Sequence, residues 1–283
     1  MEPKIVDSLG KHMDGSICRR DLLARLAGLV GGTAAACALL PQSSAQGEVV
    51  PKDDPRLHTE WIQYPGQTGP MRAYLARPKA DEKRPAVIVI HENRGLVPHI
   101  QDVARRMAVE GFLAVAPDAL SPQGGTPEDA DKARSLFQKL DYPATVKNFA
   151  AAVQYLKTHP LSTGKVGCTG FCWGGAMTNQ VAVNAPDLVA AVPYYGNPPA
   201  VEDVSKIKAA MLLHYAGRDD RINKGIPAFE KALKEAGVEY KIYVYEGAEH
   251  AFNNDTNEAR YNKEAAQLAW QRTIAFFKEK LKT

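Results

Sequence analysis

Residues 166–175 read Val-Gly-Cys-Thr-Gly-Phe-Cys-Trp-Gly-Gly, a sequence typical of a buried strand that turns sharply into a helix. The run 166–169 predicts a strand buried on both faces, and the residues from Gly174 predict the start of a helix. Gly170 and Gly174 lie two residues before and after Cys172, where a sharp strand-to-helix turn needs small residues. Such a turn aims backbone N–H groups and the positive helix end at Cys172. We therefore predict a cysteine nucleophile, the alternative being a buried structural cysteine.

The same strand pattern recurs along the body and alternates with helical patterns. Buried strands are predicted at residues 86–90, 112–116, 166–169, 189–195, 211–213 and 240–245. Helices are predicted at residues 100–110, 127–138, 144–157, 174–184, 227–236 and 259–281. An edge hairpin is predicted from two alternating runs, 61–64 and 71–77. Strands that are apolar at every position are buried on both faces and need helices on each side of the sheet. We therefore predict that residues 46–283 form a single α/β domain with a mostly parallel, doubly wound sheet.

The composition places the chain among ordinary globular proteins. Its 283 residues carry 35 Lys+Arg against 32 Asp+Glu, and 45% are hydrophobic, which is incompatible with a disordered chain. The charges are evenly interspersed, without the basic stripe that binds phosphates, so we expect no nucleic-acid partner. Length and composition are compatible with a monomer or a small homo-oligomer.

The first 45 residues differ from the rest and predict a signal-like leader. Arg19-Arg20 and Leu22-Leu23 precede an apolar run at 26–40 and a small-residue stretch at 41–46, in the order of a secretory signal. The adjacent arginines resemble a twin-arginine export signal, which predicts a periplasmic protein. The alternative is a cytoplasmic protein that retains its leader. The apolar run falls short of the roughly 18 residues that span a bilayer, so no stable membrane span is expected.

Metal and disulfide chemistry are not expected in the body. Beyond the leader, the cysteines are Cys168 in the predicted strand and Cys172 in the turn, and strand geometry directs their side chains apart. We therefore expect free thiols. No cysteine or histidine set has zinc-ligand spacing, and His91-Glu92 is followed by Gly95 where a metalloprotease helix needs histidine.

A base and an orienting carboxylate follow the predicted nucleophile in the order nucleophile, acid, histidine. Asp219 and Asp220 come after the strand at 211–213, and His250 comes after the strand at 240–245. Both sites lie just beyond the carboxyl ends of strands, where doubly wound sheets place their active sites. Asp219 is our choice for the acid, and we expect Asp220 to cap the turn or helix that follows. The alternative for His250 is a surface-loop histidine without a role.

Five motifs give residues 55–281 a clear resemblance to the dienelactone hydrolase family of α/β hydrolases, also called carboxymethylenebutenolidases. The motifs are His91-Glu92-Asn93-Arg94-Gly95, Ala116-Pro117-Asp118, residues 170–175, Gly217-Arg218-Asp219 and residues 247–252. The resemblance implies the α/β-hydrolase fold, a catalytic triad of Cys172, Asp219 and His250, and no metal or organic cofactor. It also implies that Glu92 hydrogen-bonds the resting cysteine and releases it when substrate enters.

The implied chemistry is acyl transfer in two steps. His250 deprotonates Cys172, whose reference pKa is about 8.5, and the thiolate attacks an ester or lactone carbonyl to form a thioester. The backbone N–H groups of Trp173 and Asn93 are expected to hold the oxyanion. Water then hydrolyses the thioester, with His250 as general base.

Substrate identity is less well defined. The family clamps a substrate carboxylate with two arginines, whose positions here hold Pro122 and Asn254, and Arg94 is a possible replacement. Aromatic residues expected to line the pocket include Tyr142, Tyr194, Tyr195 and Trp173. The partner is a small-molecule ester or lactone. Besides a lactone or small-ester hydrolase, the alternatives are a general carboxylesterase acting on cell-envelope or xenobiotic esters, and a non-hydrolytic redox or ligand-binding protein.

Overall fold

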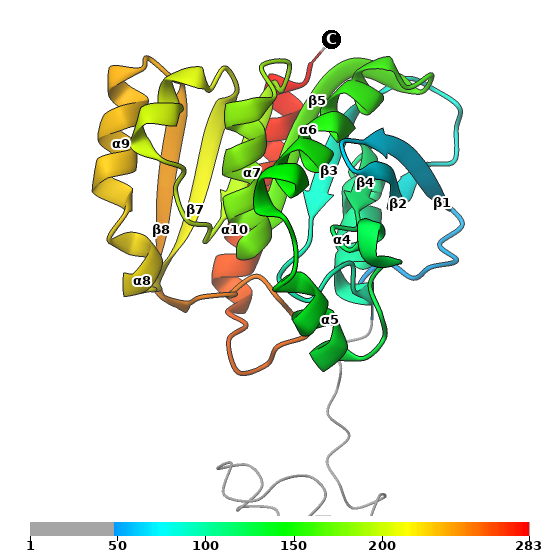
Figure 1. The fold of residues 1–283 in the computed structure, drawn as a ribbon, viewed down its shortest axis with the longest axis horizontal. Helices are drawn as coiled ribbons and strands as arrows, with labels where there is room; N and C mark the ends of the chain where they lie inside the picture. The colour runs from blue at the N-terminus through cyan, green and yellow to red at the C-terminus, as the bar shows by residue number, and fades with distance from the viewer. Residues whose placement is uncertain (1–47, 283) are drawn as a thin grey trace, which may run out of the picture. The chain divides into compact units, whose positions relative to one another are not determined.

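An eight-stranded sheet runs through the part of the chain that the computed structural model describes, residues 48–282 (Figure 1). The predicted leader over residues 1–45 lies outside the described residues. The strands are β1 (Leu57–Gly66), β2 (Gly69–Pro78), β3 (Arg84–Ile90), β4 (Leu113–Pro117), β5 (Ser162–Phe171), β6 (Ala190–Tyr194), β7 (Ala210–Arg218) and β8 (Tyr240–Glu249). Their order is β1-β2-β4-β3-β5-β6-β7-β8.

The strand directions match the patterns in the sequence. β1 and β2 form an antiparallel hairpin at one edge, with Trp61 opposite Tyr74, and β2 pairs antiparallel with β4. From β4 through β8 every neighbouring pair is parallel. The predicted edge hairpin and the mostly parallel sheet are therefore confirmed.

Helices cover both faces of the sheet. On one face lie α6 (Tyr142–Thr158), α7 (Trp173–Asn184) and α9 (Ile226–Glu235), and on the other lie α4 (Pro98–Val109) and α10 (Lys263–Lys280). Successive residues of a strand point to opposite faces, and accordingly Ile88 joins the α6 and α7 core whereas Val87 joins the α4 core. The doubly wound α/β fold is therefore confirmed.

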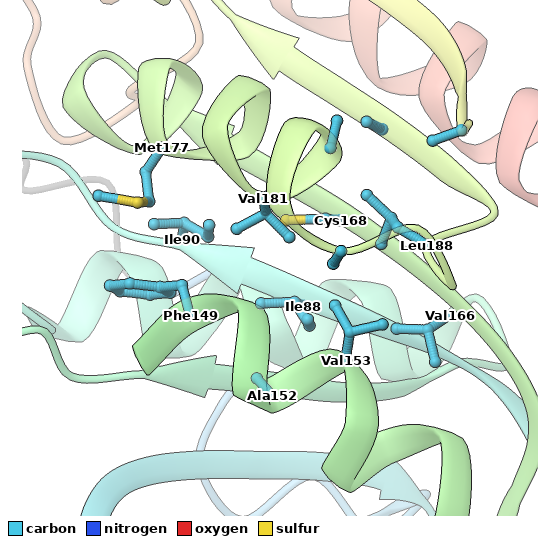
Figure 2. Close-up of a cluster of buried hydrophobic side chains, with 14 of the residues drawn as sticks. Ile88, Ile90, Phe149, Ala152, Val153, Val166, Cys168, Met177, Val181 and Leu188 are labelled. Atoms are coloured by element: carbon cyan, nitrogen blue, oxygen red, sulfur yellow. The ribbon is translucent and has the colours of Figure 1, made fainter. Parts of the chain in front are cut away.

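The centre of the first core contains Cys168, which points from β5 into a cluster with Val166 and Val181 (Figure 2). Burial raises the pKa of the Cys168 thiol to about 12, so this thiol is unreactive at neutral pH. Cys172 packs instead against the core on the opposite face. Both thiols are free, as predicted.

Two helices begin later than their sequence patterns predict. α5 (Ala130–Phe137) begins after Asp129, whose carboxylate accepts the Lys132 N–H at 2.6 Å. α10 begins after Asn262, which accepts the Ala265 N–H at 3.0 Å. These capping side chains set the helix starts, whereas an amphipathic pattern does not mark them. Among the described helices, none has the length and hydropathy needed to cross a membrane.

Short elements complete the fold at the carboxyl ends of the parallel strands. They are η1 (Ser121–Gln123), which follows β4, and α8 (Asp220–Asn223), which follows β7. With α5 and the loop after β8, they lie at the lower edge of the sheet in Figure 1. A further turn, η2 (Val201–Lys206), connects β6 to β7. The predicted nucleophile, acid and base are all at this lower edge.

Candidate active site

Cys172 occupies a strained turn between the end of β5 and the first residue of α7. Its φ of 57° and ψ of −113° are rare for a residue with a side chain, and its N–H donates to the Tyr194 carbonyl at 3.1 Å. Within residues 48–282, the non-glycine residues with positive φ are Cys172, Tyr195 and Ala251. All three lie around one cavity or beside it, which is where stored backbone strain concentrates in enzymes.

The glycines around Cys172 are required by close backbone contacts. A Cβ atom on Gly170 would lie 2.3 Å from the Gly174 carbonyl oxygen, and one on Gly174 would lie 2.4 Å from the Ile90 carbonyl oxygen. Neither backbone atom can move away without displacing β3 or α7. The turn therefore depends on small residues at the two positions that the sequence pattern indicated.

His250 and Asp219 meet beyond the ends of β8 and β7. The imidazole Nδ1 lies 2.5 Å from Oδ2 of the buried Asp219 carboxylate. Within the described part of the chain, the other ring nitrogen, Nε2, is buried and has no hydrogen-bond partner. His250 also lines the same cavity as Cys172. The imidazole is thus oriented by a carboxylate on one side and available for proton transfer on the other.

Asp220 does not have the capping position that we expected for it. It is the exposed first residue of α8, and Asp219 occupies the N-cap position. The Asp219 side chain makes no capping hydrogen bond, because its carboxylate faces His250 instead.

A cavity of about 530 Å³ opens in front of Cys172. Its wall includes Asn93, Tyr142, Trp173 and His250. The backbone N–H of Trp173 contacts the Cys172 sulfur, and Asn93 follows the carboxyl end of the neighbouring parallel strand β3. Among residues 48–282, no group of three histidine, cysteine or acidic side chains is placed to hold a metal ion.

His91 fixes the loop that carries Asn93. Its fully buried ring has Nδ1 2.6 Å from the Glu92 carbonyl oxygen, and Nε2 accepts the Ala119 N–H at 3.1 Å. The ring also stacks on Trp173, with centroids 5.6 Å apart. Burial lowers the pKa of His91, so the ring stays neutral and can accept the Ala119 N–H. His91 thereby ties together the loops after β3, β4 and β5.

The prediction that Tyr194 lines the pocket is wrong. Its side chain is fully buried on the α10 side, where the hydroxyl lies 2.6 Å from Thr273 Oγ1 and the ring packs on His214. Tyr195, which was also expected in the pocket, does line the cavity, with its ring centroid 5.0 Å from that of His250. Tyr194 is the last residue of β6, and its side chain points inward as the strand dictates. Tyr195 has a positive φ, which turns its own side chain towards the cavity.

Arg94 also does not line the cavity; it is exposed in the loop after β3. The cavity has an arginine that sequence reasoning missed, Arg221 of α8, together with the amides of Gln180 and Asn197. Two features of the sequence could have indicated that these residues lie near the site. Arg221 follows Asp219 by two residues, and Gln180 lies about two helical turns after Cys172.

Glu92 is bound to Asn254 rather than to the Cys172 thiol, contrary to what the resemblance implied. The amide nitrogen of Asn254 donates to Glu92 Oε2 at 2.8 Å. The carboxylate is nevertheless close enough for its charge to act on the thiol. The neutral amide of Asn254 thus holds the acidic side chain in place by a hydrogen bond.

The surroundings of Cys172 keep its side chain protonated at rest. Burial, and after it the negative charge of Glu92, raise the pKa of the thiol to about 11. The Trp173 N–H and the charge of Arg221 act in the opposite direction but are outweighed. At neutral pH the cysteine is therefore a thiol, and it needs a base before it can act as a nucleophile.

Replacing Glu92 with glutamine should make Cys172 more reactive towards iodoacetamide in the absence of substrate. The substitution keeps the hydrogen-bonding shape but removes a charge that raises the thiol pKa, so more thiolate forms at a given pH. We expect the alkylation rate of the wild type to keep rising between pH 8 and pH 10, because this range lies below the pKa of the Cys172 thiol. At pH 8, the rate of Glu92→Gln should be several-fold higher than that of the wild type. An unchanged rate–pH profile would show that Glu92 does not act on the thiol.

The comparisons with known proteins agree with this architecture. The family model described as "Dienelactone hydrolase family" matches residues 71–281. Protein usf from Aquifex pyrophilus is 38% identical over 75% of this chain and 94% of its own length. A candidate carboxymethylenebutenolidase from Escherichia coli K12 is 33% identical over 82% of this chain and 90% of its own.

Among solved structures, a candidate dienelactone hydrolase from Klebsiella pneumoniae superposes with a TM-score of 0.70 at 33% identity. The match covers 78% of this chain and 98% of that one. The family match extends from β2 to α10 and includes all five motifs, among them the turn at Cys172 and the histidine after β8. The chain therefore belongs to the dienelactone hydrolase family and is a hydrolase with the α/β-hydrolase fold.

Proposed function

We propose that this chain hydrolyses a carboxylic ester or lactone through a Cys172, His250 and Asp219 triad. The observation that carries the proposal is the state of His250, whose Nδ1 is held by Asp219 while its buried Nε2 has no partner among the described residues. His250 lines the cavity that contains Cys172. A protein without proton-transfer chemistry has no physical need for this arrangement.

The proposed reaction begins with proton transfer from the Cys172 thiol to His250 Nε2. The thiolate attacks the carbonyl carbon, and the N–H groups of Trp173 and Asn93 hold the oxyanion that forms. The tetrahedral intermediate collapses to a thioester, and the alcohol or enolate leaves with the proton from His250. His250 then removes a proton from a water molecule, which attacks the thioester and releases the acid and the free thiol.

Removing the charge of Asp219 should reduce activity far more than removing the charge of its neighbour Asp220. Asp219→Asn leaves the imidazole without its orienting anion, and we expect kcat for p-nitrophenyl acetate to fall by about 10²- to 10⁴-fold. Asp220→Asn removes an equal charge from the exposed adjacent position, and its kcat should stay within about twofold. Equal losses in the two variants, measured by nitrophenolate release, would contradict the proposed role of Asp219.

A general carboxylesterase is the second candidate, favoured by the position of Arg94 outside the cavity and by the asparagine at position 254. The relative rates on a carboxylated enol-lactone and a neutral p-nitrophenyl ester distinguish the two functions. A lactone hydrolase has the higher kcat/KM on the lactone, and a general esterase has the higher value on the linear ester.

We also propose that the protein is exported to the periplasm. Support comes from the paired arginines, the apolar run and the small-residue stretch within residues 1–46. The expected result is that the protein is found in the periplasmic fraction and that replacing Arg19 and Arg20 by lysine retains it in the cytoplasm. Recovery of the unaltered wild type from the cytoplasm alone would contradict export.

A further inference from the structure

The cavity in front of Cys172 has three side-chain amides in its wall, those of Asn93, Gln180 and Asn197. Asn93 and Asn197 are exposed, and Gln180 is half-buried. Among residues 48–282, none of the three side chains hydrogen-bonds another protein group, so all three are free to bind a ligand. An amide offers an N–H donor and a carbonyl acceptor, and a hydroxyl group is a ligand that uses both.

Gln180 and Asn197 belong to one wall of the cavity, where α7 contacts the loop after β6. The fully buried Asn179 precedes Gln180 on α7 and donates from Nδ2 to the Asn197 carbonyl oxygen at 2.9 Å. The loop lies directly against the start of the helix, where a Cβ atom on Gly196 would lie only 2.2 Å from the Gly175 carbonyl carbon. Two amides on a fixed backbone can bind two hydroxyl groups of one ligand without first ordering a loop.

An exposed aromatic ring completes this set of groups. Tyr142, the first residue of α6, lines the same cavity although 42% of its surface is exposed. Its ring offers a flat apolar face on which the C–H groups of a saturated ring can pack. A flat apolar face beside paired donors and acceptors fits a ring that carries several hydroxyl groups, as a sugar does.

A carboxylate would use this wall less completely than hydroxyl groups would. It accepts hydrogen bonds but donates none, so the amide carbonyl oxygens would stay without partners. A negative charge beside Cys172 would also add to that of Glu92, which already raises the pKa of the thiol. Arg221 in the same wall is exposed to water, which screens its charge, and its N–H donors can bind hydroxyl oxygens as well.

We propose that the alcohol part of the substrate is a neutral ring with several hydroxyl groups, so that the enzyme hydrolyses acylated sugars or similar polyols. This inference rests on the proposed hydrolytic function and adds the substrate class to it. In the proposed acyl transfer, Cys172 takes the acyl group, and the alcohol oxygen leaves with the proton from His250. The alcohol must then depart through the open mouth of the cavity, where Tyr142 and Asn197 are exposed. Gln180, Asn197 and Tyr142 would thus select the alcohol part.

The test compares three acetates of primary alcohols on six-membered rings, using the full chain. Methyl 6-O-acetyl-α-D-glucopyranoside carries hydroxyl groups, cyclohexylmethyl acetate carries none, and 4-(acetoxymethyl)cyclohexanecarboxylate carries a negative charge. All three are followed by the release of acetate. We expect kcat/KM for the glucoside ester to exceed that of the other two esters by about 10- to 100-fold, because each neutral hydrogen bond contributes about 2- to 10-fold.

Matched variants assign the preference to the amides of the cavity wall. Gln180→Met and Asn197→Ala should each lower the ratio of kcat/KM between the glucoside ester and cyclohexylmethyl acetate by about 2- to 10-fold. Asn184→Ala removes an exposed amide from the end of α7, outside the cavity, and should leave this ratio as in the wild type. The proposal is overturned if the wild-type ratio is near one, if the carboxylate ester has the highest kcat/KM, or if neither cavity variant changes the ratio.

A binding measurement keeps this inference separate from the proposed function. Methyl α-D-glucopyranoside, the alcohol product, should slow the alkylation of Cys172 by iodoacetamide in the wild type and less so in Gln180→Met, whereas cyclohexylmethanol should not. If the wild type hydrolyses none of the acetates but is protected by the glucoside, the hydroxyl-binding site stands and the hydrolytic proposal fails. If it hydrolyses the acetates but the glucoside protects no better than cyclohexylmethanol, the hydrolytic proposal stands and the substrate class is wrong.

Discussion

Cys172→Ala should reduce kcat for ester hydrolysis by at least about 10⁴-fold, the scale seen when a covalent nucleophile is removed from a triad. The half-buried thiol of Cys172 is the only sulfur in the cavity wall formed by the described residues, and that wall contains no serine or threonine. The residual rate would come from binding and from the oxyanion donors alone. The measurement is initial nitrophenolate release at saturating ester, with circular dichroism to show that the variant is folded.

Cys168→Ala is the matched control for this substitution. Cys168 is four residues away but points into the opposite core, where burial raises its thiol pKa to about 12. Its removal should cost some stability through the small cavity it leaves, while kcat stays within a few-fold. Activity that survives in Cys172→Ala and disappears in Cys168→Ala would contradict the assignment of the nucleophile.

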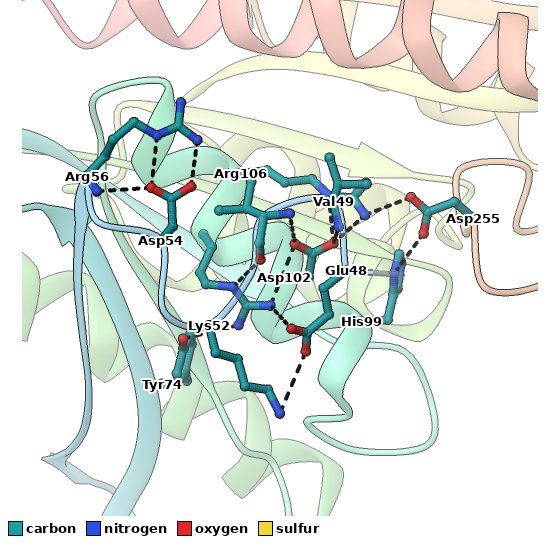
Figure 3. Close-up of polar contacts among 12 residues, drawn as sticks. Glu48, Val49, Lys52, Asp54, Arg56, Tyr74, His99, Asp102, Arg106 and Asp255 are labelled. Atoms are coloured by element: carbon teal, nitrogen blue, oxygen red, sulfur yellow. Dashed lines mark hydrogen bonds and ion pairs between the residues drawn. The ribbon is translucent and has the colours of Figure 1, made fainter. Parts of the chain in front are cut away.

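Asp102→Ala should lower the free energy of unfolding by about 3–5 kcal/mol, the usual effect of removing one partner from a buried ion pair. The Asp102 carboxylate lies in α4 and accepts the N–H groups of Val49 and Val50 at 3.1 and 2.8 Å (Figure 3). It also binds Arg106 and lies 3.6 Å from the fully buried Arg105 guanidinium. Alanine would leave the charge of Arg105 and two backbone donors poorly compensated.

The cluster around Asp102 also reaches the segment that carries the base. Arg106 donates to Asp255 at 2.7 Å, and Asp255 belongs to the loop after His250 and pairs with His99 (Figure 3). Loss of Asp102 should therefore loosen both the start of the domain at Val49 and the loop behind the active site.

Urea denaturation measures the effect, with Glu82→Ala as control. Glu82 pairs with Arg84 at 3.0 Å on the surface, and such exposed pairs contribute little to stability. We expect a large fall in the urea midpoint for Asp102→Ala and almost none for Glu82→Ala. A midpoint near that of the wild type for Asp102→Ala would show that the buried cluster is not a major source of stability.

The features that the sequence predicted well are those with local causes. Apolar runs place the strands, and the two glycines beside Cys172 are needed because backbone atoms approach within 2.4 Å of their would-be Cβ positions. The order of nucleophile, acid and histidine follows from the topology of the sheet, since all three follow strands whose carboxyl ends share one edge.

The features that sequence reasoning missed depend on residues far apart in the chain. The Glu92 contact with Asn254 spans 162 residues, and the bonds of Asp102 to residues 49 and 50 span more than 50. The burial of Tyr194 next to a Tyr195 that lines the cavity depends on the positive φ of Tyr195, which no residue type in that stretch indicates. Arg221 and Cys172, which are far apart in the chain, line the same cavity only because of the fold.

Intact-protein mass spectrometry of an acid-quenched reaction shows whether Cys172 carries the acyl group during turnover. With p-nitrophenyl acetate in excess, we predict a burst of one nitrophenolate per active site and one acetyl group per protein. Digestion of the quenched protein should locate this acetyl group on the peptide that contains Cys172. The adduct should be absent in Cys172→Ala and sensitive to hydroxylamine, as a thioester is. Turnover without any acyl group on Cys172, or an acyl group on another residue that forms and decays at the catalytic rate, would contradict the proposed mechanism.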